Sequence, residues 1–442
     1  MLPLDFIDSM SKQLGVELDS FCRALDGEPT LSVRLNDKAK VELPFDDIVP
    51  WCENAFYLSE RVQFTLDPLF HSGCYYVQEA SSMFIDEILR QYVPQDSVVL
   101  DLCAAPGGKS TIISQYVSDE GLLISNEVVR QRVFILSENM QKWGNGNTIV
   151  THNSAKDFGE MLPNLFDCIL VDAPCSGEGM FRKDEKSQDQ WSLKNVEMCA
   201  RRQQEILMDV WEALRPGGVL IYSTCTYNEL ENEQNAKFIC ERLGAQLLPL
   251  DTEREWGIQQ TIGYHFYPHK TRGEGFYVCV FRKDDASYQP LRVKGEKKKN
   301  IVAVECEKDQ RSWLGHPERW AMRQEDRFSV AYPIKYKELI DFLSTRLTCI
   351  STGIGVGEMR GKFPTPQHSL AMAKDFLTDS FVKVEIDKEK ALCYLRNEAI
   401  SLSDLPFGII LLTYHNVPLG FVKNIGNHCN NLYPKEWRIR NL

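Results

Sequence analysis

The chain has 442 residues, of which 43% are hydrophobic, enough for two or three domains with cores of their own. Its 14 cysteines include no Cys-x-x-Cys pair, which argues against a zinc site and a small disulfide scaffold, so we expect no metal. The N-terminus lacks a basic stretch followed by an apolar core, and no apolar run approaches the roughly 18 residues of a membrane span. We therefore expect a reduced, cytoplasmic monomer with no membrane partner.

The net charge of −12 is unevenly distributed. Residues 294–442 carry 23 Lys and Arg against 18 Asp and Glu, whereas residues 1–293 carry 27 against 44. Phosphate neutralisation by Lys and Arg usually supplies most of the affinity for nucleic acid. A nucleic-acid partner would therefore contact the C-terminal part of the chain and basic side chains that line the binding cleft locally. An acidic protein with an ordinary tail is the alternative.

In chain order, the pattern predicts a helical start and a strand at 31–36, then strands and helices that alternate between residues 75 and 283. This alternation predicts an α/β fold with a mostly parallel, doubly wound sheet. The predicted strands begin at residue 97 and continue at 122–126, 167–171, 218–222 and 275–281, and 196–214 is predicted as a helix. The expected division is a domain at 1–74, a domain at 75–283, a polar linker at 284–300, a mixed α/β unit at 301–375 and short β segments at 376–442.

A buried strand, a tight turn and the start of a helix follow one another at residues 97–113. Gly107 and Gly108 let the backbone approach a ligand closely, and the helix N-terminus offers free N–H groups. The spacing matches neither the dinucleotide fingerprint nor the Walker loop. The next strand ends at Glu127, a carboxylate placed to accept hydrogen bonds from ribose hydroxyls, although a solvated loop carboxylate is the plain alternative.

Two cysteines follow two further predicted strands: Cys175 in Asp-Ala-Pro-Cys-Ser-Gly-Glu-Gly at 172–179, and Cys225 in Ser-Thr-Cys-Thr at 223–226. Ligands of a doubly wound sheet bind beyond the carboxyl ends of its strands, so both thiols should face one site beside Asp172. Sulfur is intrinsically nucleophilic, and a second thiol or a carboxylate can move the protons of a covalent mechanism. Free cysteines are more often small buried apolar residues. The residues alone do not decide which thiol would attack.

These motifs, in this order, resemble the Sun/Nop family of RNA cytosine-5 methyltransferases, which use S-adenosylmethionine. Residues 75–83 resemble the motif that opens the family's catalytic domain, and Gly-Met-Phe-Arg-Lys at 179–183 resembles its ribosomal RNA branch, RsmF. The similar motifs span residues 75–283. The resemblance implies a Rossmann-like S-adenosylmethionine-dependent methyltransferase sheet with a small N-terminal α+β domain, a mixed C-terminal unit and a terminal PUA-like RNA-binding domain at 376–442.

Carried over by position, the resemblance implies that the glycine loop holds the methionine moiety of the cofactor and that Glu127 holds its ribose. Many members have an aspartate near the adenine where this chain has Ser154, and Asn153 or Asp157 could serve there instead. The predicted cofactor-binding residues are Cys103, Ala104, Ala105, Pro106, Gly107, Gly108, Lys109, Glu127, Ser154 and Asp172.

The resemblance also assigns the catalytic residues: Cys225 would attack the base, Cys175 would assist product release, and Asp172 would face the base. Carbon 5 of cytosine is a poor nucleophile, but a thiolate added to ring carbon 6 lets carbon 5 attack a sulfonium methyl group. A free thiol has a pKa of about 8.5, so the site must activate it. Asp172 suits a hydrogen bond to ring nitrogen 3, and the second cysteine, or a water that it positions, suits removal of the proton from carbon 5. Lys109 and Lys183 are cations that could hold a phosphate or lower a thiol pKa.

We therefore expect methylation of carbon 5 of a cytosine in RNA, with 16S (small-subunit) ribosomal RNA or the small ribosomal subunit as partner. Transfer RNA as substrate and a non-catalytic ribosome-assembly factor are the alternatives. An amine or protein methyltransferase typically carries Asn/Asp-Pro-Pro-Tyr/Phe at the fourth strand, where this chain has Asp-Ala-Pro-Cys at 172–175. A DNA cytosine-5 methyltransferase would attack from the cysteine of the Pro-Cys motif, here Cys175, and not from Cys225. The sequence does not give the cytosine, the number of cytosines, or whether free RNA or an assembled subunit is modified.

Arginines near aromatic residues mark possible RNA contacts outside the catalytic domain. Arg34 lies in Ser-x-Arg-x-Asn, which resembles a substrate-contacting segment of the family. Arg319, Arg323 and Arg327 accompany Trp320, and residues 430–440 alternate aromatic and basic side chains. Such side chains stack on bases and hold phosphates, although an ordinary strand with one solvated face is equally consistent.

Overall fold

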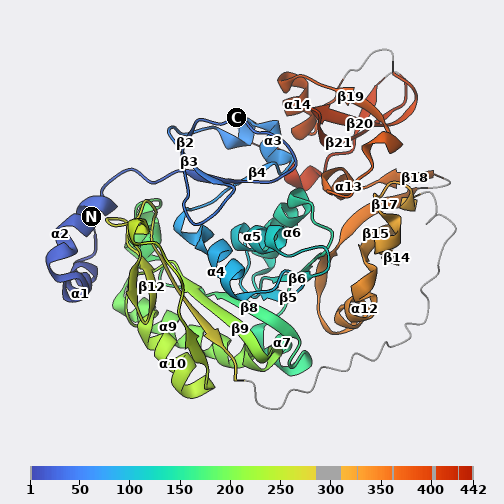
Figure 1. Ribbon diagram of the computed structural model, residues 1–442. Helices are drawn as coiled ribbons and strands as arrows, with labels where there is room; N and C mark the ends of the chain where they lie inside the picture. The colour runs from blue at the N-terminus through green and yellow to red at the C-terminus, as the bar shows by residue number, and fades with distance from the viewer. Residues whose placement is uncertain are drawn as a thin grey trace.

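The computed structural model describes residues 2–284, 310–325, 327–360, 363–400, 405–426 and 428–440, and within these ranges the strands form four sheets (Figure 1). The expected linker at 284–300 lies outside the described residues, apart from Asp284. None of the described helices has the length and apolar character needed to cross a membrane.

The N-terminal part consists of a helical pair and a small antiparallel sheet. Helices α1 and α2 bury Phe6 and Phe21 in one aromatic cluster with Phe181 and Tyr227. The latter two belong to the α/β part that contains the predicted catalytic residues, called the catalytic part below. The sheet has the order β2-β3-β1-β4. Its last strand, β4, pairs with β1, so the expected boundary between residues 74 and 75 falls at the start of a strand of this sheet. The elements are α1 Leu4–Leu14, α2 Leu18–Leu25, β1 Ser32–Leu35, β2 Phe45–Ile48, β3 Ala55–Leu58, α3 Pro68–His71 and β4 Tyr75–Val77.

Arg34 joins this sheet to the catalytic part. Its side chain is 1% exposed, lies 4.5 Å from the Trp143 ring centroid, and donates hydrogen bonds to Gln115 Oε1 (2.6 Å) and Thr111 Oγ1. Burial lowers its pKa to about 10, which still leaves the guanidinium charged near neutrality. The expectation that Arg34 contacts RNA is wrong for this structure, because the group is enclosed at the junction of two parts of the chain.

The catalytic part contains the predicted α/β sheet, with strand order β11-β12-β13-β9-β8-β5-β6-β7-β16 and β10 added to β13. Strands β7, β6, β5, β8 and β9 are parallel, and β13 returns antiparallel to β9. Their bounds are β5 Val98–Asp101, β6 Leu122–Asn126, β7 Thr148–Thr151, β8 Phe166–Asp172, β9 Leu214–Thr224, β10 Gln246–Leu248, β11 Gln259–Thr261, β12 Gly263–Phe266 and β13 Phe276–Arg282. The predicted Rossmann-like fold is confirmed.

Helices cover both faces of this sheet, α4, α5 and α6 on one and α7, α9 and α10 on the other (Figure 1). Two buried clusters of branched and aromatic side chains fill the space between the layers. The chain passes from β5 to β6 and β7 on one side and then crosses to β8 on the other side of β5. The strand order therefore reverses between β5 and β8, and the carboxyl ends of these two strands are the usual ligand position in such sheets. The helices are α4 Ile85–Tyr92, α5 Gly108–Tyr116, α6 Arg130–Trp143, α7 Ala155–Met161, α8 Glu185–Gln190, α9 Leu193–Val210 and α10 Glu233–Leu243.

The C-terminal part adds two four-stranded sheets, β14-β15-β17-β18 and β19-β20-β21-β22. Strand β16 instead pairs with β7 and extends the catalytic sheet, so the unit expected at 301–375 is built onto the catalytic part. Helix α13 contacts both β17 and β21, which links the two C-terminal sheets. The elements are β14 Trp320–Glu325, β15 Phe328–Pro333, α12 Lys337–Arg346, β16 Cys349–Thr352, β17 Ile354–Arg360, β18 Phe363–Pro366, α13 His368–Met372, β19 Val382–Glu385, α14 Lys388–Leu395, β20 Gly408–Tyr414, β21 Val417–Asn424 and β22 Cys429–Asn431.

Candidate active site

The glycine loop lies where β5 ends and α5 begins. Gly107 has a φ of 120°, which L side chains rarely adopt, and a Cβ on Gly108 would come within 3.2 Å of the Gln78 side chain. The carbonyl of Ala105 accepts a hydrogen bond from Arg132 (2.6 Å), and that of Pro106 accepts one from Asn139 (2.8 Å). Helix α6 therefore holds the loop in place and leaves the first N–H groups of α5 for a ligand.

Two buried carboxylates flank this loop. Asp101 is fully buried; its Oδ2 accepts a hydrogen bond from Ser110 (2.6 Å), and its Oδ1 has no partner among the described residues. Burial raises the pKa of Asp101 to about 7. Glu127 is 3% exposed and accepts a hydrogen bond from Val129 N (2.8 Å). Its Oε2 forms an ion pair with Arg132 Nη1 at 3.4 Å. Each carboxylate keeps acceptor capacity for polar groups of a cofactor.

Ser154 occupies the position expected near an adenine, but it also caps α7. Its hydroxyl accepts from Asp157 N, while Asp157 Oδ2 accepts from Ser154 N (2.8 Å), which completes a capping box. Asn153 Oδ1 accepts from Thr348 N (3.0 Å). All three candidates already have partners, so the adenine contact stays a prediction.

Cys175 and Cys225 lie side by side at the ends of β8 and β9. Their Sγ atoms are 3.1 Å apart, and both side chains are half-buried. The contact with Cys225 and burial raise the pKa of the Cys175 thiol well above its usual range. The two sulfurs share a hydrogen bond in which either thiol can be the donor. Burial also raises the pKa of the Cys103 thiol, so the glycine-loop cysteine is a poor nucleophile.

Asp172 ends β8, where it lies opposite Ser223 of β9, two residues before Cys225. Its Oδ2 accepts a hydrogen bond from Lys109 Nζ and its Oδ1 accepts one from Ser223 Oγ, both at 2.8 Å. Burial alone would lower the pKa of Lys109, but the Asp172 carboxylate outweighs it and the pKa is raised. Lys109 therefore ties the glycine loop to Asp172 as a cation. Lys183 is exposed.

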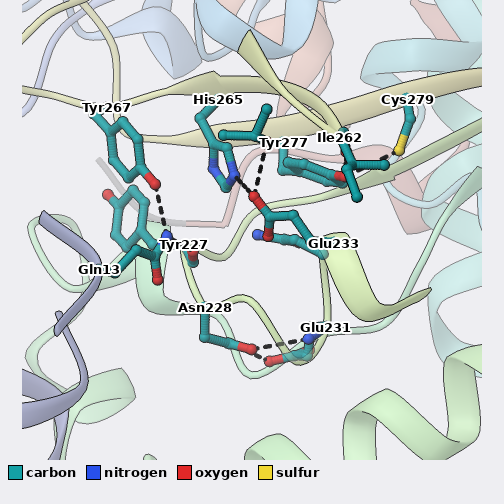
Figure 2. A network of polar contacts seen from close by, with 12 residues as sticks. Gln13, Tyr227, Asn228, Glu231, Glu233, Ile262, His265, Tyr267, Tyr277 and Cys279 are labelled. Atoms are coloured by element: carbon teal, nitrogen blue, oxygen red, sulfur yellow. Dashed lines mark hydrogen bonds and ion pairs between the residues drawn. The ribbon is translucent and has the colours of Figure 1, made fainter. Parts of the chain in front are cut away.

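The sequence did not indicate two buried carboxylates that join the cysteine loops. Glu178, 1% exposed, accepts hydrogen bonds from Tyr227 N (2.7 Å), from Asn228 N and Nδ2 (both 3.0 Å) and from Trp191 Nε1 (3.0 Å). Glu231 accepts from Ser176 N (3.0 Å) and from Asn228 Nδ2 (2.8 Å), and Figure 2 shows Asn228 beside Glu231. The only signal was the position of Glu178, three residues after Cys175.

Hydrogen bonds from Gln13 and Gly179 also hold the loop that contains Cys225. Gln13 of α1 donates to the carbonyl of Tyr227 (2.8 Å) and to the Tyr267 hydroxyl (2.7 Å), so the N-terminal helix touches this loop (Figure 2). Gly179 N donates to Cys225 O at 2.8 Å, and a Cβ on Gly179 would meet the same oxygen at 2.8 Å. Position 179 therefore requires glycine.

The arrangement fits a sulfonium nucleoside cofactor. The unpartnered Asp101 Oδ1 and the free N–H groups of α5 match polar groups of an amino acid moiety, and the acceptor Glu127 matches a ribose. Among the described residues no cluster of His, Cys, Asp and Glu could hold a metal ion.

Comparison with known proteins covers nearly the whole chain. The family model for 16S rRNA methyltransferase RsmB/F matches residues 88–282, the N-terminal domain of 16S rRNA methyltransferase RsmF matches 2–80, and the methyltransferase RsmF PUA domain matches 381–439. The ribosomal RNA small subunit methyltransferase F of Erwinia tasmaniensis is 31% identical over 473 residues, 98% of this chain and 96% of the relative. That of Aeromonas salmonicida is 40% identical over 268 residues, 58% of this chain and 56% of the relative.

Solved structures agree with this relationship. A methyltransferase homologue from Pyrococcus horikoshii has a TM-score of 0.53 and 27% identity, over 63% of this chain and 94% of its own. NSun6 from the same organism, crystallised with SFG, an analogue of S-adenosylmethionine, has a TM-score of 0.54 over 64% of this chain and 98% of its own, and at 21% identity it shows the fold alone. The predicted family and the predicted cofactor, S-adenosylmethionine, are confirmed. The chain belongs to the ribosomal RNA small subunit methyltransferase F family of S-adenosylmethionine-dependent methyltransferases.

Proposed function

We propose that the protein transfers a methyl group from S-adenosylmethionine to carbon 5 of a cytosine in 16S ribosomal RNA. The observation that carries the proposal is the contact of Cys175 with Cys225, 3.1 Å between sulfurs, beside the Lys109–Asp172 ion pair. A methyltransferase for amines has no use for two adjacent thiols, whereas addition to a pyrimidine ring uses one as nucleophile and one for protons. The relatives named for the small ribosomal subunit support 16S RNA over transfer RNA.

The cofactor supplies a methyl group on a sulfonium sulfur. Residues 103–109 would hold its methionine moiety, Glu127 its ribose, and Ser154 or a neighbour its adenine. Lys109 would keep Asp172 oriented toward the same space from the side of the glycine loop. The loop would thus bring the methyl group and the base-binding carboxylate together.

Cys225 loses its thiol proton and adds to ring carbon 6 in this proposal. Ring nitrogen 3 gains a proton in the same step and then donates a hydrogen bond to the Asp172 carboxylate, which pairs with Lys109. The Cys175 thiol, whose pKa is raised, would donate a hydrogen bond to the Cys225 thiolate before the attack. After methyl transfer the proton on carbon 5 must leave before the carbon–sulfur bond breaks. Cys175, once its own proton has passed to solvent, or a water that it holds, would take that proton, and Cys225 would leave ring carbon 6 as the thiolate.

The proposed setting follows from the substrate. Ribosomal RNA or an assembling small subunit is reached in the cytoplasm, and we propose that the protein acts there as a monomer. The site belongs to one chain: glycine loop, both thiols and Asp172 lie at the edge of a single sheet.

The test is methylation of 16S RNA from a strain that lacks the gene. Purified protein with S-adenosylmethionine should form 5-methylcytosine, detected by nucleoside mass spectrometry and located by bisulfite sequencing. Cys225→Ser should abolish the product, and Cys199→Ser, a half-buried cysteine on α9, should not. Methylation of transfer RNA but not of 16S RNA would overturn the choice of substrate.

A further inference from the structure

A groove of about 1000 Å³ separates the N-terminal sheet from the last residues of the described chain. One wall is formed by residues 61–66, the other by residues 437–440, and Leu31, His71 and Val77 complete the lining. Residues far apart in sequence thus form one surface, which neither part presents alone.

The lining of this groove is basic in a chain whose net charge is −12. Arg61, Arg438 and Arg440 are exposed, and none of them has an ion-pair partner within the described part of the chain. No described Asp or Glu lines the groove. Arginines elsewhere form ion pairs, as Arg323 does with Glu325. Three free guanidinium groups without a nearby carboxylate in the lining are suited to phosphates.

Aromatic side chains lie between these arginines. Phe64 and Trp437 are half-buried and line opposite walls, and the Trp437 ring also receives the Lys142 ammonium at 5.3 Å from its centroid. His71 is 6% exposed, with Nδ1 lacking a hydrogen-bond partner among the described residues. Rings that stack on bases, with guanidinium groups along the backbone, are the usual combination for single-stranded nucleic acid.

One residue of the lining is the sequence neighbour of a residue that lies against the cofactor loop. Val77, in its lining, is followed by Gln78, which packs against Gly108. An RNA strand in the groove would therefore lie against the same strand, β4, that supports the glycine loop.

We propose that this groove binds a single-stranded segment of the substrate RNA outside the target cytosine, with phosphates on Arg61, Arg438 and Arg440 and bases on Phe64 and Trp437. The inference rests on the proposed function for the identity of the RNA. An acidic protein segment is the competing occupant, but it would leave the two rings without a role.

The experiment measures binding of a fluorescein-labelled oligouridylate to the full chain over a range of salt concentrations. The variant Arg61→Gln/Arg438→Gln/Arg440→Gln should bind on the order of tenfold more weakly and lose about 2 units of the slope of log K against log salt, since each phosphate contact on a single strand contributes about 0.7. Trp437→Ala should weaken binding about tenfold with little change in slope, the loss of one stacked base. Arg254→Gln, an exposed arginine outside the groove, is the matched control and should bind as the parent does.

An unchanged slope in the triple variant overturns the proposal. The proposal is also overturned if the triple variant keeps its RNA binding but no longer binds a polyglutamate peptide that the parent binds. That result would assign the groove to an acidic protein segment. Methylation of 16S RNA by the parent protein is measured in parallel. If the parent fails to methylate, the proposed function fails; if it methylates and the triple variant binds RNA normally, only the groove assignment fails.

Discussion

Cys175 Sγ lies 3.1 Å from Cys225 Sγ, and this contact together with burial raises the pKa of the Cys175 thiol. In the proposed mechanism the two cysteines have different tasks: Cys225 attacks the base, and Cys175 assists release of the product.

The two thiols should fail in opposite ways when removed. Cys225→Ala cannot bond to ring carbon 6, so methylation and any protein–RNA adduct should both vanish. Cys175→Ala should still attack and transfer the methyl group but lose the group that removes the carbon-5 proton, so the enzyme should stall as an adduct. A denaturing gel with labelled RNA and S-adenosylmethionine should show a slow band for Cys175→Ala alone. A band for Cys225→Ala instead would exchange the roles, and two active variants without a band would refute the covalent mechanism.

Glu127 should control cofactor affinity. Charge reversal in Glu127→Lys removes a charge-assisted hydrogen bond to the ribose, which costs about 1.5 to 3 kcal/mol, or about a ten- to hundredfold loss of affinity. Titration calorimetry with S-adenosylmethionine measures the change. The control is Glu160→Lys on α7, where the carboxylate is 65% exposed. Equal affinity in Glu127→Lys and the parent would reject the ribose assignment.

The sequence was sufficient for the catalytic sheet and its motifs, because strands of apolar residues and a glycine turn are local patterns. Asp172, Cys175 and Cys225 come together because the carboxyl ends of parallel strands share one edge, a rule that needs no distances. The 31–36 strand and the terminal β segments were also predictable from local alternation.

Contacts between distant segments were not predictable. The motif around Arg34 resembled an RNA contact, yet burial against α5 and α6 gives it a structural role that no local pattern reveals. The pairing of β16 with β7 joins residues about 200 positions apart, beyond the reach of periodicity. Ser154 looked like a cofactor residue, but a capping box uses the same side chain, and sequence spacing serves both readings equally.

Acid should weaken the folded state through His368. This ring is 7% exposed, neither nitrogen has a partner among the described residues, and it lies edge-on to Tyr433 and Trp437. Burial lowers its pKa from 6.5 to about 3. The unfolded chain therefore binds the proton first, so stability is lost as pH falls from about 6.5 toward 3, by about 2 kcal/mol at pH 5. His368→Phe should reduce the fall in melting temperature between neutral pH and pH 5. An unchanged pH dependence in this variant would show that the histidine is not responsible.

Glu178 should act as a positioning residue for Cys225. Its carboxylate accepts hydrogen bonds from Tyr227 N, Asn228 N and Trp191 Nε1, so it holds the segment that directly follows Cys225. In Glu178→Gln the amide nitrogen replaces one acceptor oxygen and faces donors in either orientation. One buried group left unsatisfied costs about 1 to 3 kcal/mol.

The melting temperature of Glu178→Gln should therefore fall, and kcat should fall with it as the Cys225 loop shifts, while affinity for S-adenosylmethionine stays unchanged because the glycine loop follows β5. The matched control is Glu197→Gln on α9, whose carboxylate is 57% exposed and pairs with Arg201. Melting curves, steady-state kinetics and calorimetry on both variants separate the effects. A positioning role requires the rate of the Cys225 reaction to change. If Glu178→Gln has a lower melting temperature but the same kcat as the parent, measured where both proteins are folded, then Glu178 contributes only to stability.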